Sequence, residues 1–299
     1  MYFKNIIDAV GHTPLIELQR TSPSQKVKIM VKLEGQNPGG SASIKDRVAK
    51  YMIEKAEQSG ALTRDKTIVE ATSGNTGIAL AWLGRQKGYK VTIVMPDSMS
   101  MERRQLLRFH GAELILTKGA LGMGAAIAKA SEMAEKDKKY FMPDQFSNPA
   151  NPLAHYETTA VEILDDFPYD KIDVLVAGIG TGGTIIGIAR RLREKYPNIK
   201  VIGAEPPPGD EIQGLKCLGE ALPPFWDKAL ITERARVSSQ QAAGATTQLL
   251  KKEGIFTGLS SGAVAHQAVK AAAEIGEGNI VAILADAGWK YLSLDFWNK

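Results

Sequence analysis

The sequence has few residues of the kinds that bind metals or form disulfide bonds. Cys217 is the one cysteine among 299 residues, so an internal disulfide bond is excluded and a reducing compartment, the cytoplasm, is expected. The four histidines show no spacing typical of metal ligands, and Cys217 lies in no C-x-x-C pair. We therefore expect no metal site.

Long apolar runs and a strong charge of one sign are also missing. No run of about 18 apolar residues predicts a membrane-spanning helix, and residues 1–8 lack the pattern of a signal peptide. The formal net charge is +4, with lysines and arginines spread along the chain. The densest basic cluster, residues 190–195, has no interleaved aromatic residues. It is interpreted as a solvated face near a helix C-terminus, and nucleic-acid binding is not expected.

What the sequence does contain is a regular alternation of strand-like and helix-like segments. Strands are predicted at residues 27–33, 67–71, 91–95, 113–117, 172–177, 200–205 and 280–285. Helices are predicted at residues 43–59, 75–87, 100–110, 182–195, 240–252 and 261–275. Gly60, Gly88 and Gly111 follow helices, where a left-handed residue ends the helix. This order predicts an α/β fold of parallel sheets with helices on both faces.

The length favours two domains, and the turn-rich segment 144–152 is predicted to join them. Ligands of open parallel sheets bind beyond the C-terminal ends of the strands. Four loops of unusual composition lie at such positions.

The first loop, residues 178–184, follows a predicted strand and opens a helix. Its glycines and threonines, with the helix N-terminus, predict a phosphate site. Gly178, Gly180 and Gly183 also satisfy G-x-G-x-x-G, and Glu205 ends the next strand. This is the fingerprint of dinucleotide binding, so an NAD-dependent oxidoreductase stays open at this point.

The other three loops carry hydroxyl groups and one lysine. Residues 72–77 have three hydroxyls and an amide at a helix start, which predicts an anion site of the size of a carboxylate. Ser43 is interpreted as an N-cap, which places Lys45 in the first turn of a helix. A cation is disfavoured there, which favours the neutral amine of Schiff-base chemistry. Residues 258–263 are either a capping pair or a further binding loop.

Together these loops resemble the O-acetylserine sulfhydrylase (cysteine synthase) family of fold-type II pyridoxal-phosphate enzymes. The resemblance runs over nearly the whole chain. Its motifs are G-H-T-P-L at 11–15, S-I-K-D-R at 43–47, E-A-T-S-G-N-T-G at 70–77, M-P at 95–96, E-R-R at 102–104, Q-F-S-N-P-A-N-P at 145–152, the loop at 180–184, G-L-S-S-G-A at 258–263 and Y-L-S at 291–293.

The resemblance implies a role for each matching residue. Lys45 would carry pyridoxal 5'-phosphate as an internal aldimine and act as acid and base. Asn75 would bond the O3′ of the cofactor and Ser260 its pyridine nitrogen. The cofactor phosphate would be bound by Gly180, Thr181, Gly182, Gly183 and Thr184. The substrate carboxylate would be bound by Thr72, Ser73, Gly74, Thr76 and Gln145.

The resemblance further implies a tryptophan synthase β-like fold with the active site in a cleft between two domains. Residues 1–40 and 144–299 would form the larger, cofactor-binding domain, and residues 41–143 a smaller mobile substrate domain. The reaction would be β-replacement of the acetyl group of O-acetyl-L-serine by sulfide through an α-aminoacrylate, giving L-cysteine. A homodimer is implied, and serine acetyltransferase is a candidate partner.

Several alternatives remain beside this reading. Two are enzymes: one similar to cystathionine β-synthase and one that uses O-phosphoserine. The third is a non-catalytic homologue that serves as a binding partner. In relatives that accept O-phosphoserine an arginine occurs at about the position of Lys216, so we predict O-acetylserine as the main substrate with O-phosphoserine use that depends on Lys216. The loop at 37–45 is two residues longer than the family pattern, and residues 286–290 replace a more polar segment.

Overall fold

The computed structural model describes residues 1–72, 74–99, 101–219 and 222–298, and the side chains of residues 102, 295 and 298 are outside the description. The chain forms two compact units. Unit 1 consists of Met1–Val10 and Asn37–Ala150, and unit 2 of Gly11–Gln36 and Asn151–Lys299. Each unit is described by itself. The domain boundaries expected from the resemblance, and the mobility of the smaller domain, stay predictions.

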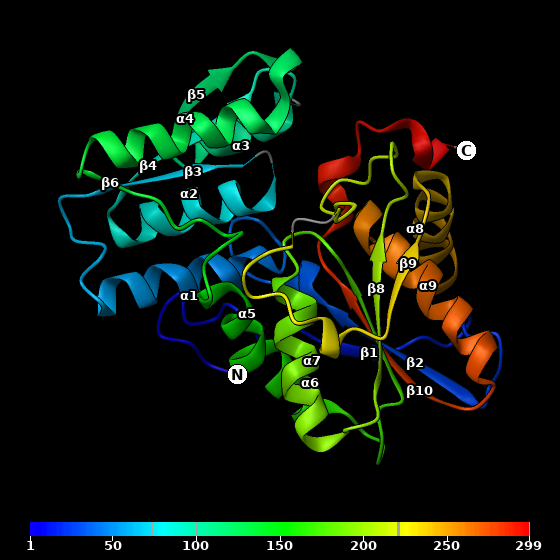
Figure 1. Cartoon of the computed structure of the whole chain (residues 1–299). Coiled ribbons are helices and arrows are strands. Elements are labelled where there is room, and N and C mark those ends of the chain that lie inside the picture. The colour runs from blue at the N-terminus through cyan, green and yellow to red at the C-terminus, as the bar shows by residue number, and fades with distance from the viewer. Residues whose placement is uncertain (73, 100, 220–221, 299) are drawn as a thin grey trace. The chain divides into compact units, whose positions relative to one another are not determined.

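Unit 1 is built on a four-stranded parallel sheet. The strand order is β5 (Glu113–Thr117), β4 (Lys90–Pro96), β3 (Thr67–Ala71) and β6 (Tyr140–Phe141). One face packs on α1 (Lys45–Gln58), α2 (Asn75–Lys87) and α3 (Met101–Phe109). The other face packs on α4 (Gly122–Lys136), as Figure 1 shows. Alternate residues of β3 therefore face different helices: Ile68 joins the first core and Val69 the second.

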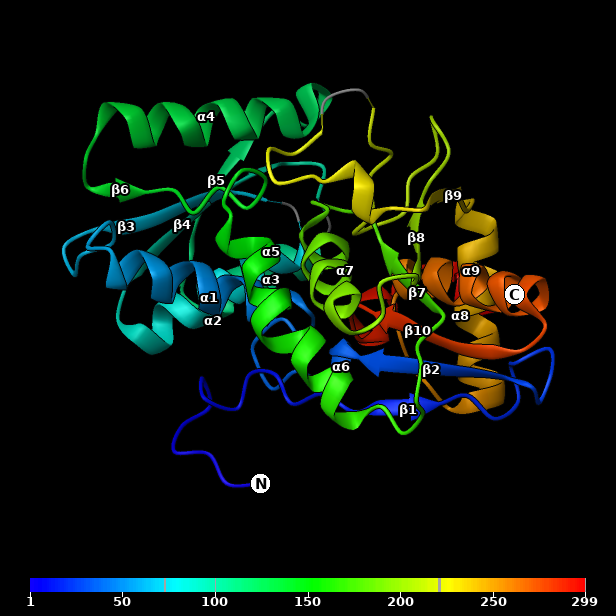
Figure 2. The ribbon, with the colours of Figure 1, turned by 60° about the horizontal axis from the view of Figure 1, so that its bottom comes forward.

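Unit 2 is built on a six-stranded sheet. Its order is β1 (Leu15–Glu17), β2 (Val27–Leu33), β10 (Gly278–Leu284), β7 (Val174–Gly178), β8 (Lys200–Glu205) and β9 (Glu233–Arg236). All neighbours are parallel except β1 and β2. The helices of this unit are α6 (Ala160–Asp166), α7 (Gly183–Lys195), α8 (Ser239–Glu253) and α9 (Leu259–Ile275), arranged on both sides of the sheet (Figure 2).

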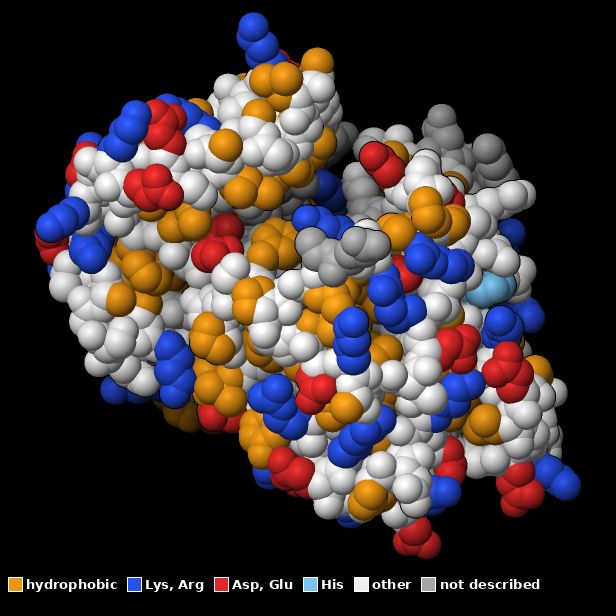
Figure 3. Space-filling view, in the orientation of Figure 1, with side chains coloured by type: hydrophobic (Ala, Val, Ile, Leu, Met, Phe, Trp, Pro, Cys, Tyr) orange, Lys and Arg blue, Asp and Glu red, His pale blue; other side chains and the backbone are white. Residues whose placement is uncertain are grey.

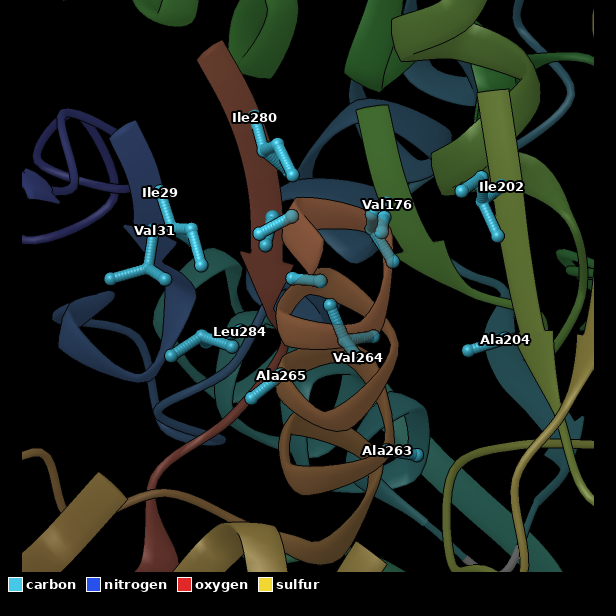
Figure 4. Close-up of a cluster of buried hydrophobic side chains, with 14 of the residues drawn as sticks. Ile29, Val31, Val176, Ile202, Ala204, Ala263, Val264, Ala265, Ile280 and Leu284 are labelled. Carbon is cyan, nitrogen blue, oxygen red and sulfur yellow. The ribbon is translucent and has the colours of Figure 1, made fainter. Parts of the chain in front are cut away.

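The main core of unit 2 lies between α9 and the sheet. Figure 4 shows Val264 and Ala265 of α9 among side chains of the sheet, including Ile280 of β10 and Val176 of β7. These side chains are almost fully buried. Because alanines line α9, its axis can lie close to the sheet.

The remaining elements are short. They are η1 (Glu34–Gln36), η2 (Gly119–Leu121), α5 (Ala150–Ala154), the π-helical turn η3 (His155–Thr159), η4 (Lys228–Leu230), η5 (Gly288–Tyr291) and η6 (Asp295–Asn298). Across the described ranges, no helix is both long and apolar enough for a bilayer crossing. Lys and Arg side chains alternate with Asp and Glu on the face shown in Figure 3. In the basic cluster of α7, Arg191 pairs with Glu194 at 3.1 Å.

The predicted α/β fold with parallel sheets is confirmed. Four predicted strands and the helix at 75–87 have the bounds that the sequence predicts, and Gly60, Gly88 and Gly111 take positive φ after their helices. Missed were β1, β6, β9, α4 and the helical segments between 150 and 166. In α4 the buried residues are Ala126 and Ala130, so large apolar residues do not reveal its period.

Candidate active site

The first feature of the site in unit 1 is the start of α1. Lys45 is the first residue of this helix, and its side chain is half-buried. The N–H of Lys45 donates to Ser43 Oγ at 3.1 Å. The residue at the N-cap position is Ile44, which makes no side-chain capping bond. The prediction of Ser43 as N-cap is therefore wrong by one position, although its hydroxyl does bond the helix start.

The loop that precedes α1 is held by the buried carboxylate of Asp46. This carboxylate accepts from the N–H groups of Ser41, at 3.1 Å, and Ser43, at 3.2 Å. A Cβ atom on Gly39 would overlap the same carboxyl group, so the chain approaches Asp46 closely only with glycine there. Ala42 takes a positive φ of 42° within this turn. These contacts give the path of the loop that is longer than the family pattern.

The second feature is the loop between β3 and α2. The hydroxyl of Thr72 accepts from the N–H of Gly74 at 3.2 Å, and Asn75 is the first residue of α2. A Cβ atom on Gly77 would lie 2.8 Å from the methyl group of Thr72, so this tight turn requires glycine. The N-cap, Gly74, has no side chain to occupy the helix start. The predicted carboxylate ligand Ser73 lies outside the described residues.

Two of the predicted carboxylate ligands meet although 69 positions separate them. The Thr76 hydroxyl donates to Gln145 Oε1 at 2.7 Å, and both side chains are buried. This bond directs the amide oxygen of Gln145 toward Thr76, and the amide nitrogen is the donor end of this side chain.

The carboxyl group of Glu70, to which the sequence analysis gave no role, bonds the residue next to Gln145. Glu70 is the last residue but one of β3, and its Oε2 accepts from the N–H of Asp144 at 2.9 Å. Burial and the nearby charge of Asp144 raise the pKa of Glu70 to about 8, against hydrogen bonds from the backbone of Asp144 and Gln145. Burial therefore favours the neutral form of the Glu70 carboxyl group.

In unit 2, the loop after β7 has the properties of a phosphate cradle. It leads into α7, whose N-cap Gly182 has a φ of 87°. A Cβ atom on Gly180 would lie 2.6 Å from the carbonyl oxygen of Gly214, and one on Gly183 would overlap the amide of Asn151. The backbone N–H groups at the start of α7 and the hydroxyls of Thr181 and Thr184 are the donors of this loop.

Two side chains from the preceding helical segment hold the threonine hydroxyls. Asn151 Nδ2 donates to Thr181 Oγ1 at 2.9 Å, and His155 Nε2 lies 3.2 Å from Thr184 Oγ1. The other ring nitrogen of His155 lies 3.0 Å from Thr159 Oγ1. The π-helical turn at His155–Thr159 widens the helix at this point, which is common where a helix serves a site. Sequence analysis gave neither His155 nor Asn151 a separate role.

The loop at 209–216 connects the cradle to Ser260. Gly214 has a φ of 92°, and a Cβ atom on it would lie 3.4 Å from the hydroxyl of Ser260, which is buried at the start of α9. The N–H of Lys216 donates to the carbonyl oxygen of Ile179 at 2.8 Å. The Lys216 side chain is exposed, yet surrounding protein atoms desolvate the amine and lower its pKa.

The dinucleotide alternative depends on Glu205, whose side chain is fully buried. Its carboxylate accepts two hydrogen bonds from Arg234, at 3.1 and 2.9 Å, and one from the N–H of Leu218 at 3.0 Å. Arg236 lies 3.4 Å from it. Glu205 is thus part of a buried ion-pair cluster, and the geometry does not favour its use as a ribose ligand.

The comparisons with known proteins agree with this geometry. The family described as pyridoxal-phosphate dependent enzyme matches residues 6–286. A cysteine synthase of Staphylococcus aureus is 42% identical over 303 residues, which cover 98% of this chain and 97% of the relative. The chain belongs to the cysteine synthase family of pyridoxal-phosphate-dependent enzymes.

Two solved structures are similar to the enzyme over almost all of its length. A cysteine synthase from Entamoeba histolytica has a TM-score of 0.92 and 38% identity, covering 100% of this chain and 92% of that chain. A hydrogen sulfide-producing enzyme from Fusobacterium nucleatum has a TM-score of 0.90 and 44% identity, covering 97% and 100%. The predicted family and cofactor are confirmed.

The residues present fit pyridoxal phosphate. The cradle of residues 180–184 has close backbone approaches that exclude side chains and two oriented hydroxyls, as a phosphate group requires. Among the described residues, no group of histidine, cysteine and carboxylate side chains could hold a metal ion. The individual roles expected for Lys45, Asn75 and Ser260 stay predictions.

Proposed function

We propose that the enzyme is a cysteine synthase that exchanges the acetyl group of O-acetyl-L-serine for sulfide, giving L-cysteine and acetate. The observation that supports this most is the meeting of Thr76 and Gln145 beside a helix start. A carboxylate fits there, and a phosphate fits the cradle of residues 180–184. Two separate anion sites suit an amino acid that reacts on a phosphorylated cofactor.

When bound, pyridoxal phosphate supplies an electron sink for the bonds at the α-carbon of the amino acid. Gly180, Thr181, Gly182, Gly183 and Thr184 bind its phosphate, Asn75 its O3′ and Ser260 its pyridine nitrogen. Lys45 Nζ carries the cofactor, takes the α-proton and holds it for return. Thr72, Ser73, Gly74, Thr76 and Gln145 orient the substrate through its carboxylate.

Exclusion of water is the second task of the protein in this proposal. The smaller domain, residues 41–143, closes when the carboxylate binds and protects the activated amino acid from hydrolysis. The enzyme acts as a cytoplasmic homodimer, and serine acetyltransferase is its candidate partner. The family resemblance supports these proposals.

The function is tested by a substrate panel on the purified enzyme. Serine, O-acetylserine and O-phosphoserine are each combined with sulfide and with homocysteine. We expect the highest kcat/KM for O-acetylserine with sulfide, with cysteine as product. A higher kcat/KM with homocysteine would instead indicate a cystathionine-forming enzyme.

Loss of the Thr76–Gln145 pair is expected to weaken amino-acid binding. A hydrogen bond to a charged group contributes about 1.5–3 kcal/mol, so Thr76→Val and Gln145→Ala should each raise KM for O-acetylserine by about 10- to 100-fold. KM for sulfide should stay within about twofold, because the sulfide carries no carboxylate. Ser147→Ala, in the same loop, is the control. Unchanged KM in both variants would contradict this role.

Lys216 is expected to affect the phosphate ester alone. A dianionic phosphate gains more from a nearby ammonium group than an acetyl ester does. Lys216→Ala should therefore lower kcat/KM for O-phosphoserine by about tenfold and leave O-acetylserine within about twofold. The exposed residue Lys228, changed to alanine, is the control. Equal losses on both esters would remove Lys216 from the substrate site.

A further inference from the structure

Glu70 is a buried acid that the proposed mechanism does not use. It is 4% exposed and lies at the C-terminal end of β3, directly before the loop that carries Thr72 and Thr76. Burial of a carboxyl group has a free-energy cost, because the protein interior disfavours its charge. We therefore looked for the contact that Glu70 makes.

The partner of Glu70 is a residue in an unfavourable backbone conformation. Asp144 has a φ of 49°, which few residues other than glycine adopt. Such a conformation is strained and persists where surrounding contacts fix it. The bond from the N–H of Asp144 to Glu70 is one of these contacts.

The other contacts close a tight turn. The carbonyl oxygen of Asp144 accepts from the N–H groups of Ser147, at 3.1 Å, and Asn148, at 2.9 Å. The side chain of Asn148 donates to the carbonyl oxygen of Pro143 at 2.8 Å. Gln145 lies inside this turn, and its side chain accepts a hydrogen bond from Thr76. The direction of the Gln145 side chain therefore depends on the backbone that Glu70 holds.

We propose that Glu70 is a positioning residue, whose buried carboxyl group holds the Asp144 turn and so aims the Gln145 amide at the carboxylate of the amino-acid substrate. This inference rests on the proposed role of Gln145. Glutamine has nearly the same shape as Glu70 and keeps an oxygen that can accept from the N–H of Asp144, so it should replace Glu70 at this contact.

The test compares three variants of the enzyme with its cofactor bound. Glu70→Gln should keep KM for O-acetylserine within about threefold. Glu70→Met removes both oxygens, and Glu70→Asp shortens the side chain by one methylene group. Both should raise that KM by about tenfold or more, with a smaller change in kcat, because the Gln145 amide would lose its bond to the charged carboxylate of the substrate. Thr92→Val, which removes a hydroxyl bond on the neighbouring strand β4, should not change KM.

Hydrogen exchange of the amides of Asp144 and Gln145 gives a second readout that is independent of the substrate. Exchange there should be faster in Glu70→Met and Glu70→Asp and unchanged in Glu70→Gln. Unchanged exchange and KM in all three variants would overturn the proposal. Faster exchange with unchanged KM would support the positioning by Glu70 and contradict the carboxylate role of Gln145. If Glu70→Met fails to fold, the comparison of Glu70→Asp with Glu70→Gln decides.

Discussion

Replacing Lys45 with alanine is expected to reduce turnover by about 10³-fold or more. Positioned acid–base groups contribute about 10²–10⁴-fold to rates, and the proposal assigns Lys45 the transfer of the α-proton as well as the attachment of the cofactor. Its place at the first residue of α1, half-buried, limits its freedom to move away. Turnover is measured with O-acetylserine and sulfide.

The attachment itself is measured separately. Borohydride reduction of the purified enzyme followed by peptide mapping should place the pyridoxyl group on Lys45. Lys50→Ala, in the same helix, is the control and should keep full turnover. A label on another lysine would contradict the assignment, whatever the kinetics show.

The largest effect on stability is expected at Lys32. Its side chain is fully buried in β2, where it lies 2.9 Å from Glu162 Oε2 and donates to the carbonyl oxygen of Thr13 at 2.6 Å. Removing one partner of a buried ion pair leaves the other uncompensated and costs about 3–5 kcal/mol. Lys32→Met should therefore lower the free energy of unfolding, measured by urea denaturation, by about this amount.

Two further variants separate the buried charge from the loss of a lysine. Lys28 lies on β2 like Lys32, and it forms a more exposed ion pair with Glu17 of β1 at 3.1 Å. Lys28→Met removes this pair and should cost less than about 1 kcal/mol. Glu162→Gln combined with Lys32→Met should recover part of the loss. Glutamine is neutral and can still accept from the N–H of His12, which bonds Glu162 at 2.9 Å. Similar losses in Lys32→Met and Lys28→Met would show that burial of the pair is unimportant.

Local patterns in the sequence predicted much of the fold. Glycines after helices and apolar runs between them gave the bounds of β2, β3, β5, β8 and α2. The same reasoning missed β9 (Glu233–Arg236), because Ala235 is the one apolar residue among its four and gives too little of an apolar pattern to indicate a strand. Its arginines bond Glu205 on the neighbouring strand instead.

The candidate site was predictable to a similar degree. Loop composition pointed to residues 72–77 and 180–184, but not to the side chains behind them. Glu70 and Asp144, or Asn151 and Thr181, are separated by tens of residues, and no local pattern pairs them. Local signals were present for single residues: Glu70 begins the motif at 70–77, and Asn151 belongs to the motif at 145–152. The N-cap error at Ser43 concerns a residue whose own N–H is bonded by the Asp46 side chain, a contact that the residue types alone do not reveal.

The contacts of Gly214 limit how this enzyme could be redesigned. The carbonyl oxygen of Gly214 faces Gly180, and its α-carbon faces Ser260. Main-chain atoms of Gly214 therefore lie between the loop at 180–184 and the start of α9. A mutational library that varied Gly214 would yield mostly impaired clones, because its φ of 92° strains any residue with a side chain. Varying Gly180 would fail for a different reason, since a Cβ atom there would lie 2.6 Å from the carbonyl oxygen of Gly214.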